Sequence, residues 1–275
     1  MKGKWIKVLK IVLVAILVVG LAVVLRRQME YATGAADYDE AAELAGVPKS
    51  LPSAVPAVTA APGESSAPEP AEEPDPALAL LAQVDLAALQ AVNDEVRGWI
   101  CIPDTELSYP LMLGADNQYY LDHTWQGNRN GVGAIFLDYR TSADLTDFYT
   151  LIYGHRMNNT SMFGSIVQYK DIKYWQAHPS VYIICEDGVK RYDIFSAFET
   201  DVYSDVYRRS LRTAEDREAF LAWCLEQSAI DTGVVPDADG NIITLSTCTN
   251  TDRDHRWVVL AALADPMEPG IAAAP

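Results

Sequence analysis

Three residues with reactive side chains lie where apolar runs of the sequence meet polar ones. Cys248 ends the run NIITLSTC, His155 follows the run FYTLIYG, and Arg256 begins the run RWVVLAAL. A thiolate acts as a nucleophile, an imidazole transfers protons near neutral pH, and a guanidinium stays charged and stabilises an oxyanion. The three types suit acyl transfer through a thioester, although position alone favours a buried core thiol for Cys248. Whether Cys248 is a nucleophile or a core thiol depends on how the surrounding elements place the three residues.

Eight short apolar runs separated by turn residues predict eight strands. They are GWICI, ELSYPLML, GAIFLD, FYTLIYG, SVYIICE, KRYDIFSAFE, NIITLSTC and RWVVLAAL. Asp187 and Gly188 stand between two of these runs, which is typical of a β-hairpin. The ends of strands in a barrel converge on one rim, so a barrel would bring His155 and Cys248 together across 93 positions of sequence. The predicted fold class is mainly β, a β-barrel with peripheral helices.

Two helices are predicted around these strands. Asp75 and Pro76 form an N-cap and a first helical position, and apolar residues then recur at three- and four-residue spacing until the helix ends near Gly98. Thr213 with Asp216 resembles a capping box before an apolar face, which predicts a helix inserted ahead of the cysteine strand.

The N-terminal segment predicts a membrane anchor. Residues 5–25 are apolar apart from Lys7 and Lys10, and about 20 such residues cross a bilayer. Lysines precede the segment and an acidic region follows it, so the positive-inside rule places the N-terminus in the cytoplasm and the rest of the chain outside. The alternative is a signal peptide cleaved near Ala32 to Ala35.

The following segment is rich in alanine, proline, serine and acidic residues, which predicts an extracellular linker. It holds much of the net charge of −17. No basic or aromatic-rich surface for nucleic acid is present, which excludes that class of function. The expected domains are a cytoplasmic tip with a transmembrane anchor at 1–27, the linker at 28–76, a catalytic domain at 77–265 and a disordered tail at 266–275.

The four cysteines, Cys101, Cys185, Cys224 and Cys248, show no C-x-x-C spacing, so we predict no metal site. Cys185 ends an apolar strand and Cys224 falls in a predicted helix, and both are expected in the core. A disulfide among four extracellular cysteines stays open at this point.

The segments TLSTC, YGH and RWVV together resemble the signature of the sortases, the cysteine transpeptidases of Gram-positive cell surfaces. The segments NDEVRGWICIPDTELSYPLMLGADNQYYL, GAIFLDYR and LIYGHRMNNTSMFGSIVQY are similar to the class B subgroup, as is the helix before the cysteine strand. The resemblance covers Asn93 to Leu263. It implies an eight-stranded sortase-type barrel, a membrane-tethered extracellular enzyme and no cofactor.

The resemblance also implies a role for each reactive residue. Cys248 attacks the threonine carbonyl of a C-terminal sorting motif and forms a thioacyl-enzyme. His155 protonates the leaving amine and later deprotonates the incoming one, while Arg256 stabilises the oxyanion or positions the substrate. Arg253 is the alternative for this last role. The acceptor amine belongs to peptidoglycan or its lipid-linked precursor, or to a pilin lysine if the enzyme polymerises pili.

Class B sortases use motifs similar to N-P-x-T-N or N-P-x-T-G, and four residues match positions that contact them. Asn117 and Leu121 lie in the NQYYL region, and Tyr153 and Ser246 lie in the two catalytic strands. Each also has a purely structural interpretation. Asn117 would begin a helix and Leu121 would contact the core. Tyr153 would pack in the core, and the Ser246 hydroxyl would bond to a neighbouring backbone group. Arg156 and Thr249, beside the catalytic pair, depart from the residues common in the family and leave motif preference open.

Two other classes of protein are alternatives. Papain-like and NlpC-type peptidases place the cysteine before the histidine, and L,D-transpeptidases have glycine directly before the cysteine, whereas this chain has histidine first and Thr247 before Cys248. A non-enzymatic surface module or pilus component is the other alternative. The C-terminal sequence ADPMEPGIAAAP carries no sorting motif, hydrophobic tail or basic end, which argues against a sortase substrate.

Overall fold

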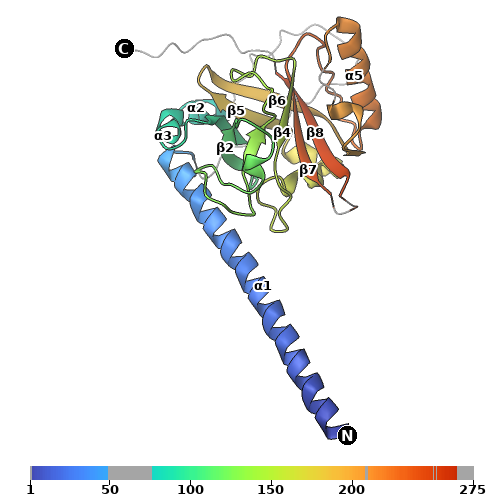
Figure 1. Cartoon of the computed structure of the whole chain (residues 1–275). Coiled ribbons are helices and arrows are strands. Elements are labelled where there is room, and N and C mark those ends of the chain that lie inside the picture. Colours follow the sequence, from blue (N-terminus) through green and yellow to red (C-terminus); the bar gives the residue numbers. More distant parts are fainter. Residues whose placement is uncertain (1, 49–75, 208–209, 250, 252, 265–275) are drawn as a thin grey trace.

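The computed structural model describes residues 2–48, 76–207, 210–249, 251 and 253–264. Eight strands close into one barrel in the order β1-β2-β3-β4-β7-β8-β6-β5 (Figure 1). They are β1 (Val96–Cys101), β2 (Ser108–Met112), β3 (Ile135–Leu137), β4 (Tyr149–Tyr153), β5 (Ser180–Cys185), β6 (Gly188–Asp201), β7 (Ile242–Cys248) and β8 (His255–Leu263). The predicted eight-stranded, mainly β fold is confirmed.

Helices surround the barrel, and the long α1 projects away from it (Figure 1). The α-helices are α1 (Lys2–Leu44), α2 (Pro76–Leu81), α3 (Leu86–Gln90), α4 (Ile172–Ala177) and α5 (Ala214–Gln227). Short 3-10 helices are η1 (Tyr119–Leu121), η2 (Ser165–Lys170) and η3 (Asp205–Tyr207). The helix predicted ahead of the cysteine strand is α5, and the Thr213 hydroxyl caps it by accepting from the Asp216 amide at 3.1 Å.

The strand β7 is buried on both faces, which explains its continuous apolar sequence. Ile243 and Leu245 enter the main core, whereas Ile242 faces a second core beneath α5. Phe220 and Leu221 of α5 pack in that second core. The even-numbered positions of β7 therefore face the side that α5 covers.

The predicted helix from Pro76 to Gly98 is wrong in its extent. The chain forms two short helices instead, and the Asp85 side chain caps the second by accepting from the Ala88 amide at 3.0 Å. Val96 already pairs with Met112 in the sheet. Pairing of β1 with both β2 and β5 overrides the helical spacing of its apolar residues.

The expected linker differs from the structure over residues 28–44, because α1 continues to Leu44 and packs on the barrel. Tyr38 is buried there, and its hydroxyl donates to the Gly133 carbonyl at 2.5 Å. The Trp125 indole donates to the Asp37 carbonyl at 2.8 Å. Alanine-rich sequence has high helix propensity, and it gains further stability from this tertiary contact. Residues 49–75 of the expected linker and the tail at 266–275 lie outside the described residues.

Within the part of the chain that the structure describes, one helix is long and apolar enough to cross a bilayer, and it is α1. Its 43 residues extend about 65 Å at about 1.5 Å per residue. An N-terminal helix of this kind fits a single-pass membrane anchor.

Tyr149 joins β4, β7 and η3 through one buried hydroxyl. The hydroxyl donates to the Val206 carbonyl at 2.8 Å and accepts from the Thr244 hydroxyl at 2.8 Å. Its ring packs edge-on against Phe220 of α5 at 5.0 Å between centroids. This contact fixes η3 beside β7.

Tyr149→Phe is expected to lower the free energy of unfolding by about 1–3 kcal/mol, because it leaves the buried Val206 carbonyl and Thr244 hydroxyl without their partner. Chemical denaturation measures the change. Tyr203→Phe is the matched control, since the Tyr203 side chain is 87% exposed and its variant should unfold like the parent. Equal stability of the two variants would contradict the structural role of the Tyr149 hydroxyl.

Candidate active site

The strand register places Cys248 beside Arg256. The two residues are direct partners in the antiparallel pair β7–β8. Directly opposed residues of such a pair project from the same face, with Cβ atoms about 5 Å apart. The predicted thiol and the predicted guanidinium therefore lie together, and Cys248 is exposed.

The neighbouring strand β4 brings His155 to the same end of the sheet. Tyr153 pairs with Ser246 in the parallel pair β4–β7, and His155 and Cys248 each lie two residues farther along. The Gly154 amide donates to the Ser246 carbonyl at 3.2 Å, and the Thr247 hydroxyl donates to the Gly154 carbonyl at 2.8 Å. These bonds tie the segment that carries His155 to the cysteine strand.

The His155 imidazole is half-buried, and two chain segments hold it. Its Nε2 lies 2.6 Å from the Leu121 carbonyl oxygen, and its own carbonyl accepts from the Phe163 amide at 3.0 Å. Gly133 adopts a φ of +63°, and a Cβ there would lie 2.9 Å from His155 Cδ2 and 2.8 Å from the Leu121 carbonyl oxygen. Leu121 is thus brought to the site, with its backbone carbonyl on the histidine and its side chain 38% exposed.

Arg256 is held by the turn that precedes it. Its Nη1 donates to the Arg253 carbonyl at 2.8 Å and to the His255 carbonyl at 2.9 Å. The Arg253 side chain is exposed and precedes β8, so it lacks the strand register with Cys248. The geometry favours Arg256 over the alternative Arg253.

Tyr207 belongs to this site, although no pattern in the sequence marks it. Its hydroxyl lies 2.9 Å from the Ser246 hydroxyl. Burial raises the pKa of Tyr207, the Ser246 hydrogen bond and the Arg256 charge oppose the rise, and Cys248 adds to it. Tyr207 therefore lies close enough to both Cys248 and Arg256 to interact electrostatically with them. It sits in η3, which has no apolar periodicity to mark it.

Asn117 and Tyr153 meet on a buried carboxylate. Asp138 is fully buried and accepts from the Asn117 amide at 3.0 Å and the Tyr153 hydroxyl at 3.1 Å. Arg140 forms two hydrogen bonds to the same carboxylate, each of 2.9 Å, and this contact raises the pKa of Arg140. The Asn117 side-chain oxygen also accepts from the Tyr139 amide at 2.9 Å. Both polar groups of Asn117 are thus engaged within the protein.

The thiols divide into one exposed and three buried groups. All four cysteines are free. Cys185 and Cys224 are buried, as expected from the sequence, and Cys101 is buried as well. Burial raises the pKa of Cys185 to about 12 and raises the pKa of Cys101 and Cys224 further still. A thiol with a raised pKa holds little thiolate at neutral pH, so the exposed Cys248 is the thiol suited to act as a nucleophile.

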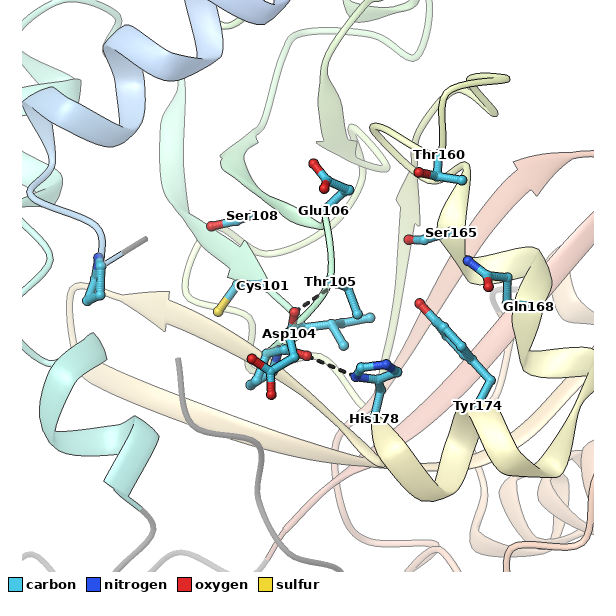
Figure 2. A pocket seen from close by; sticks show the side chains of 13 residues that line it. Cys101, Asp104, Thr105, Glu106, Ser108, Thr160, Ser165, Gln168, Tyr174 and His178 are labelled. Carbon is cyan, nitrogen blue, oxygen red and sulfur yellow. Dashed lines mark hydrogen bonds between the residues drawn. The ribbon is translucent and has the colours of Figure 1, made fainter. Parts of the chain in front are cut away.

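A cavity of about 360 Å³ lies apart from these residues (Figure 2). Its walls include Cys101, Thr105, Tyr174 and His178, and the His178 Nδ1 lies 3.0 Å from the Pro103 carbonyl oxygen. None of the predicted catalytic residues lines it. A second cavity, of about 320 Å³, does have His155 in its wall. Among the described residues, no cluster of histidine, cysteine and carboxylate side chains could hold a metal ion.

Comparisons with known proteins show the family to which the chain belongs. The family model described as the sortase domain matches residues 100–264. The sortase B of Listeria monocytogenes is 35% identical over 173 residues, which are 62% of this chain and 69% of that protein.

Two solved structures are similar over most of their length. The sortase B from B. anthracis in complex with AAEK1 has a TM-score of 0.67 at 29% identity and covers 86% of this chain and 98% of its own. The Staphylococcus aureus sortase B-substrate complex has a TM-score of 0.62 at 27% identity and covers 65% of this chain and 83% of its own. The chain therefore belongs to the sortase family, and it is a cysteine transpeptidase of class B.

Proposed function

We propose that this sortase is anchored in the cell membrane and cleaves an NPxTN-like or NPxTG-like motif after threonine through a thioester on Cys248. It then transfers the cleaved protein to an amine of peptidoglycan or of its precursor. The observation that carries the proposal is the register of β7. It sets the exposed thiol of Cys248 opposite Arg256. It also pairs Ser246 with Tyr153, so that Cys248 and His155 each follow two residues later at the same end of the sheet. The S. aureus relative solved with a substrate supports a peptide ligand for this site.

The first half-reaction forms the thioester. The Cys248 thiolate attacks the threonine carbonyl carbon, and the Arg256 guanidinium stabilises the resulting oxyanion. The carbon–nitrogen bond to the next residue then breaks, and His155 in its imidazolium form gives a proton to the leaving amine. The products are an acyl-enzyme and the released C-terminal peptide.

The second half-reaction consumes the thioester. The acceptor amine attacks the thioester carbonyl, and the now neutral His155 takes the proton that the nitrogen releases. The carbon–sulfur bond breaks, an amide forms, and the Cys248 thiolate and the His155 imidazolium are restored. No cofactor takes part in either step.

Three features support the proposed substrate contacts. The buried Ser246 hydroxyl bonds to the Tyr207 hydroxyl, and Tyr207 interacts electrostatically with Cys248 and Arg256. Leu121 exposes its side chain while its carbonyl contacts His155. Asn117 and Tyr153 both donate to the buried Asp138 carboxylate. We therefore assign them to the wall of the motif-binding site, where they hold the shape of the site through this carboxylate.

The proposed localisation rests on the N-terminal sequence. Residues 1–27 form the cytoplasmic tip and anchor, and the catalytic domain at 77–265 lies outside the membrane with residues 28–76 between them. Lysines precede the apolar segment, which favours a cytoplasmic N-terminus. Both the sorted proteins and the acceptor lie at this membrane surface.

Cys248→Ala is expected to abolish the thioester while the fold is retained, because the exposed end of β7 tolerates a smaller side chain. The measurement is mass spectrometry of the chain with NPxTN and NPxTG peptides, with and without triglycine or a lysine peptide as the amine. The parent should gain an acyl adduct on Cys248 that the amine converts into a new amide. Turnover by the variant would reject Cys248 as the nucleophile, and the productive amine separates peptidoglycan-type transfer from pilin-type transfer.

Arg256→Lys is expected to lower kcat/KM at least tenfold, because an ammonium cannot reproduce the planar fork of a guanidinium. Arg253→Lys is the matched control in the same turn and should keep activity within about twofold, since Arg253 contributes its backbone carbonyl. A larger loss of kcat/KM in Arg253→Lys than in Arg256→Lys would instead identify Arg253 as the residue that stabilises the oxyanion.

Gly133→Ala is expected to lower kcat at least tenfold with little loss of folded protein. The added Cβ would meet the backbone oxygens of Tyr120 and Leu121 at 2.7 and 2.8 Å and displace the carbonyl that holds His155. Gly46→Ala is the control, because Gly46 has a similar φ of +65° but open space around its Cβ position. Equal kinetics in the two variants would show that the support of His155 is not required.

A further inference from the structure

The chain segment that supports His155 is itself bound by α1. The Tyr38 hydroxyl donates to the Gly133 carbonyl at 2.5 Å, and the Trp125 indole donates to the Asp37 carbonyl at 2.8 Å. Tyr38 and Trp125 are both buried, and burial raises the pKa of Tyr38, so its hydroxyl stays a donor. Further hydrogen bonds join the same two segments, from Thr124 to Asp37 and from Asn130 to Glu30 and Thr33.

Gly133 connects the contact with α1 to the catalytic histidine. It adopts a φ of +63°, and a Cβ at this position would lie 2.9 Å from His155 Cδ2 and 2.8 Å from the Leu121 carbonyl oxygen. The backbone of Gly133 is thus packed directly against the imidazole and against the carbonyl that bonds to it. A displacement of the Gly133 carbonyl, which Tyr38 holds, would shift both of these groups.

A second set of contacts runs from Tyr38 to the backbone of His155. The Tyr38 ring packs edge-on against the Tyr109 ring at 5.1 Å between centroids, and the Tyr109 hydroxyl accepts from the Met162 amide at 3.0 Å. The next residue, Phe163, donates its amide to the His155 carbonyl at 3.0 Å. One side chain of α1 therefore supports the histidine from two sides, through its hydroxyl and through its ring.

The Leu121 carbonyl decides which ring nitrogen of His155 can exchange a proton. A carbonyl oxygen only accepts hydrogen bonds, so the nitrogen that lies 2.6 Å from it, Nε2, carries the hydrogen. In the neutral ring Nδ1 then holds the free lone pair, and it is the atom that takes the proton of an amine. If the Leu121 carbonyl moved away, the other tautomer would become accessible, with its lone pair on the wrong nitrogen.

We propose that Tyr38 is a positioning residue for His155, and that the docked part of α1 keeps the enzyme competent for proton transfer. Tyr38 acts through Gly133 and the Leu121 carbonyl, which together fix the place and the tautomer of the imidazole. The inference rests on the proposed acyl transfer from Cys248. It adds that the helix leading to the apolar N-terminal segment controls the rate of a reaction in which it takes no direct part.

The kinetic test uses the full chain in dodecyl maltoside micelles with an NPxTN or NPxTG donor peptide and triglycine as the amine. Tyr38→Phe should lower kcat about tenfold, because a small displacement of a proton-transfer group costs rate. The KM for the donor peptide should stay within about twofold, since the substrate contacts are retained.

The tautomer of His155 gives a readout that does not depend on turnover. Magic-angle-spinning NMR of the chain with isotope-labelled histidine distinguishes the two tautomers at about pH 9, where an ordinary imidazole is neutral. The signals of His155 are identified by their loss in His155→Gln. The parent should show the Nε2–H tautomer, and Tyr38→Phe should show a mixture of both.

Tyr169→Phe is the matched control for Tyr38→Phe. It also removes a buried hydroxyl that donates to a backbone carbonyl, that of His178 at 2.7 Å. Both variants should unfold at a lower denaturant concentration than the parent, because each leaves a carbonyl without its donor. Only Tyr38→Phe should change kcat and the tautomer of His155.

Gly34→Ala tests the docking of α1 without altering Tyr38. The added Cβ would lie 2.8 Å from a methyl group of Val132 and would push the helix away from the loop, so this variant should also lower kcat. Gly20→Ala is its control in the same helix, because a Cβ there meets open space, and it should keep the parent kcat.

Parent values of kcat and of the tautomer in both Tyr38→Phe and Gly34→Ala would overturn the positioning role. An equal loss of kcat in Tyr38→Phe and Tyr169→Phe would also overturn it, because such a loss reflects general destabilisation. Absence of the acyl adduct on Cys248 in the parent would instead reject the underlying acyl transfer, and the tautomer of His155 would still decide whether Tyr38 positions the imidazole.

Discussion

The pairing of β7 between β4 and β8 is the constraint on which the site depends. Strand side chains alternate between faces, so a slip of one residue in β7 would turn Cys248 away from Arg256 and Tyr207. The register is held because β7 is buried on both faces, with Ile243 and Leu245 in one core and Ile242 in the other. The cost of exposing these side chains keeps the cysteine where the proposed chemistry requires it.

The same constraint separates stability from reactivity along one strand. From Ile242 to Thr247 the strand is buried, and only its last residue, Cys248, is exposed. A buried thiol is disfavoured as a thiolate, as the raised pKa of Cys224 in the second core illustrates. An enzyme of this class therefore needs a strand end that leaves the core, as β7 does at Cys248.

The docking of α1 is a second constraint, and it connects the barrel to the apolar N-terminal segment. A flexible linker beginning at residue 28 would let the barrel turn freely over a membrane. In the structure, Tyr38 and the Asp37 backbone bind the loop that also supports His155. The orientation of the active site relative to the apolar segment is consequently set by the fold.

The sequence by itself determined the features with a local signal: the eight strands, the capped helix α5, and the place of Cys248 at a strand end. Each depends on alternation, turn residues or a cap within a few positions. Tertiary structure alone decided the rest. It made β1 begin at Val96, where the apolar residues still follow a helical spacing, and it extended α1 over residues 28–44. It also brought Tyr207 to Ser246 and Asn117 to Asp138. Those outcomes depend on partners outside the local sequence, up to 95 positions away for Tyr38 and Gly133, whose contacts stabilise a conformation that no local pattern specifies.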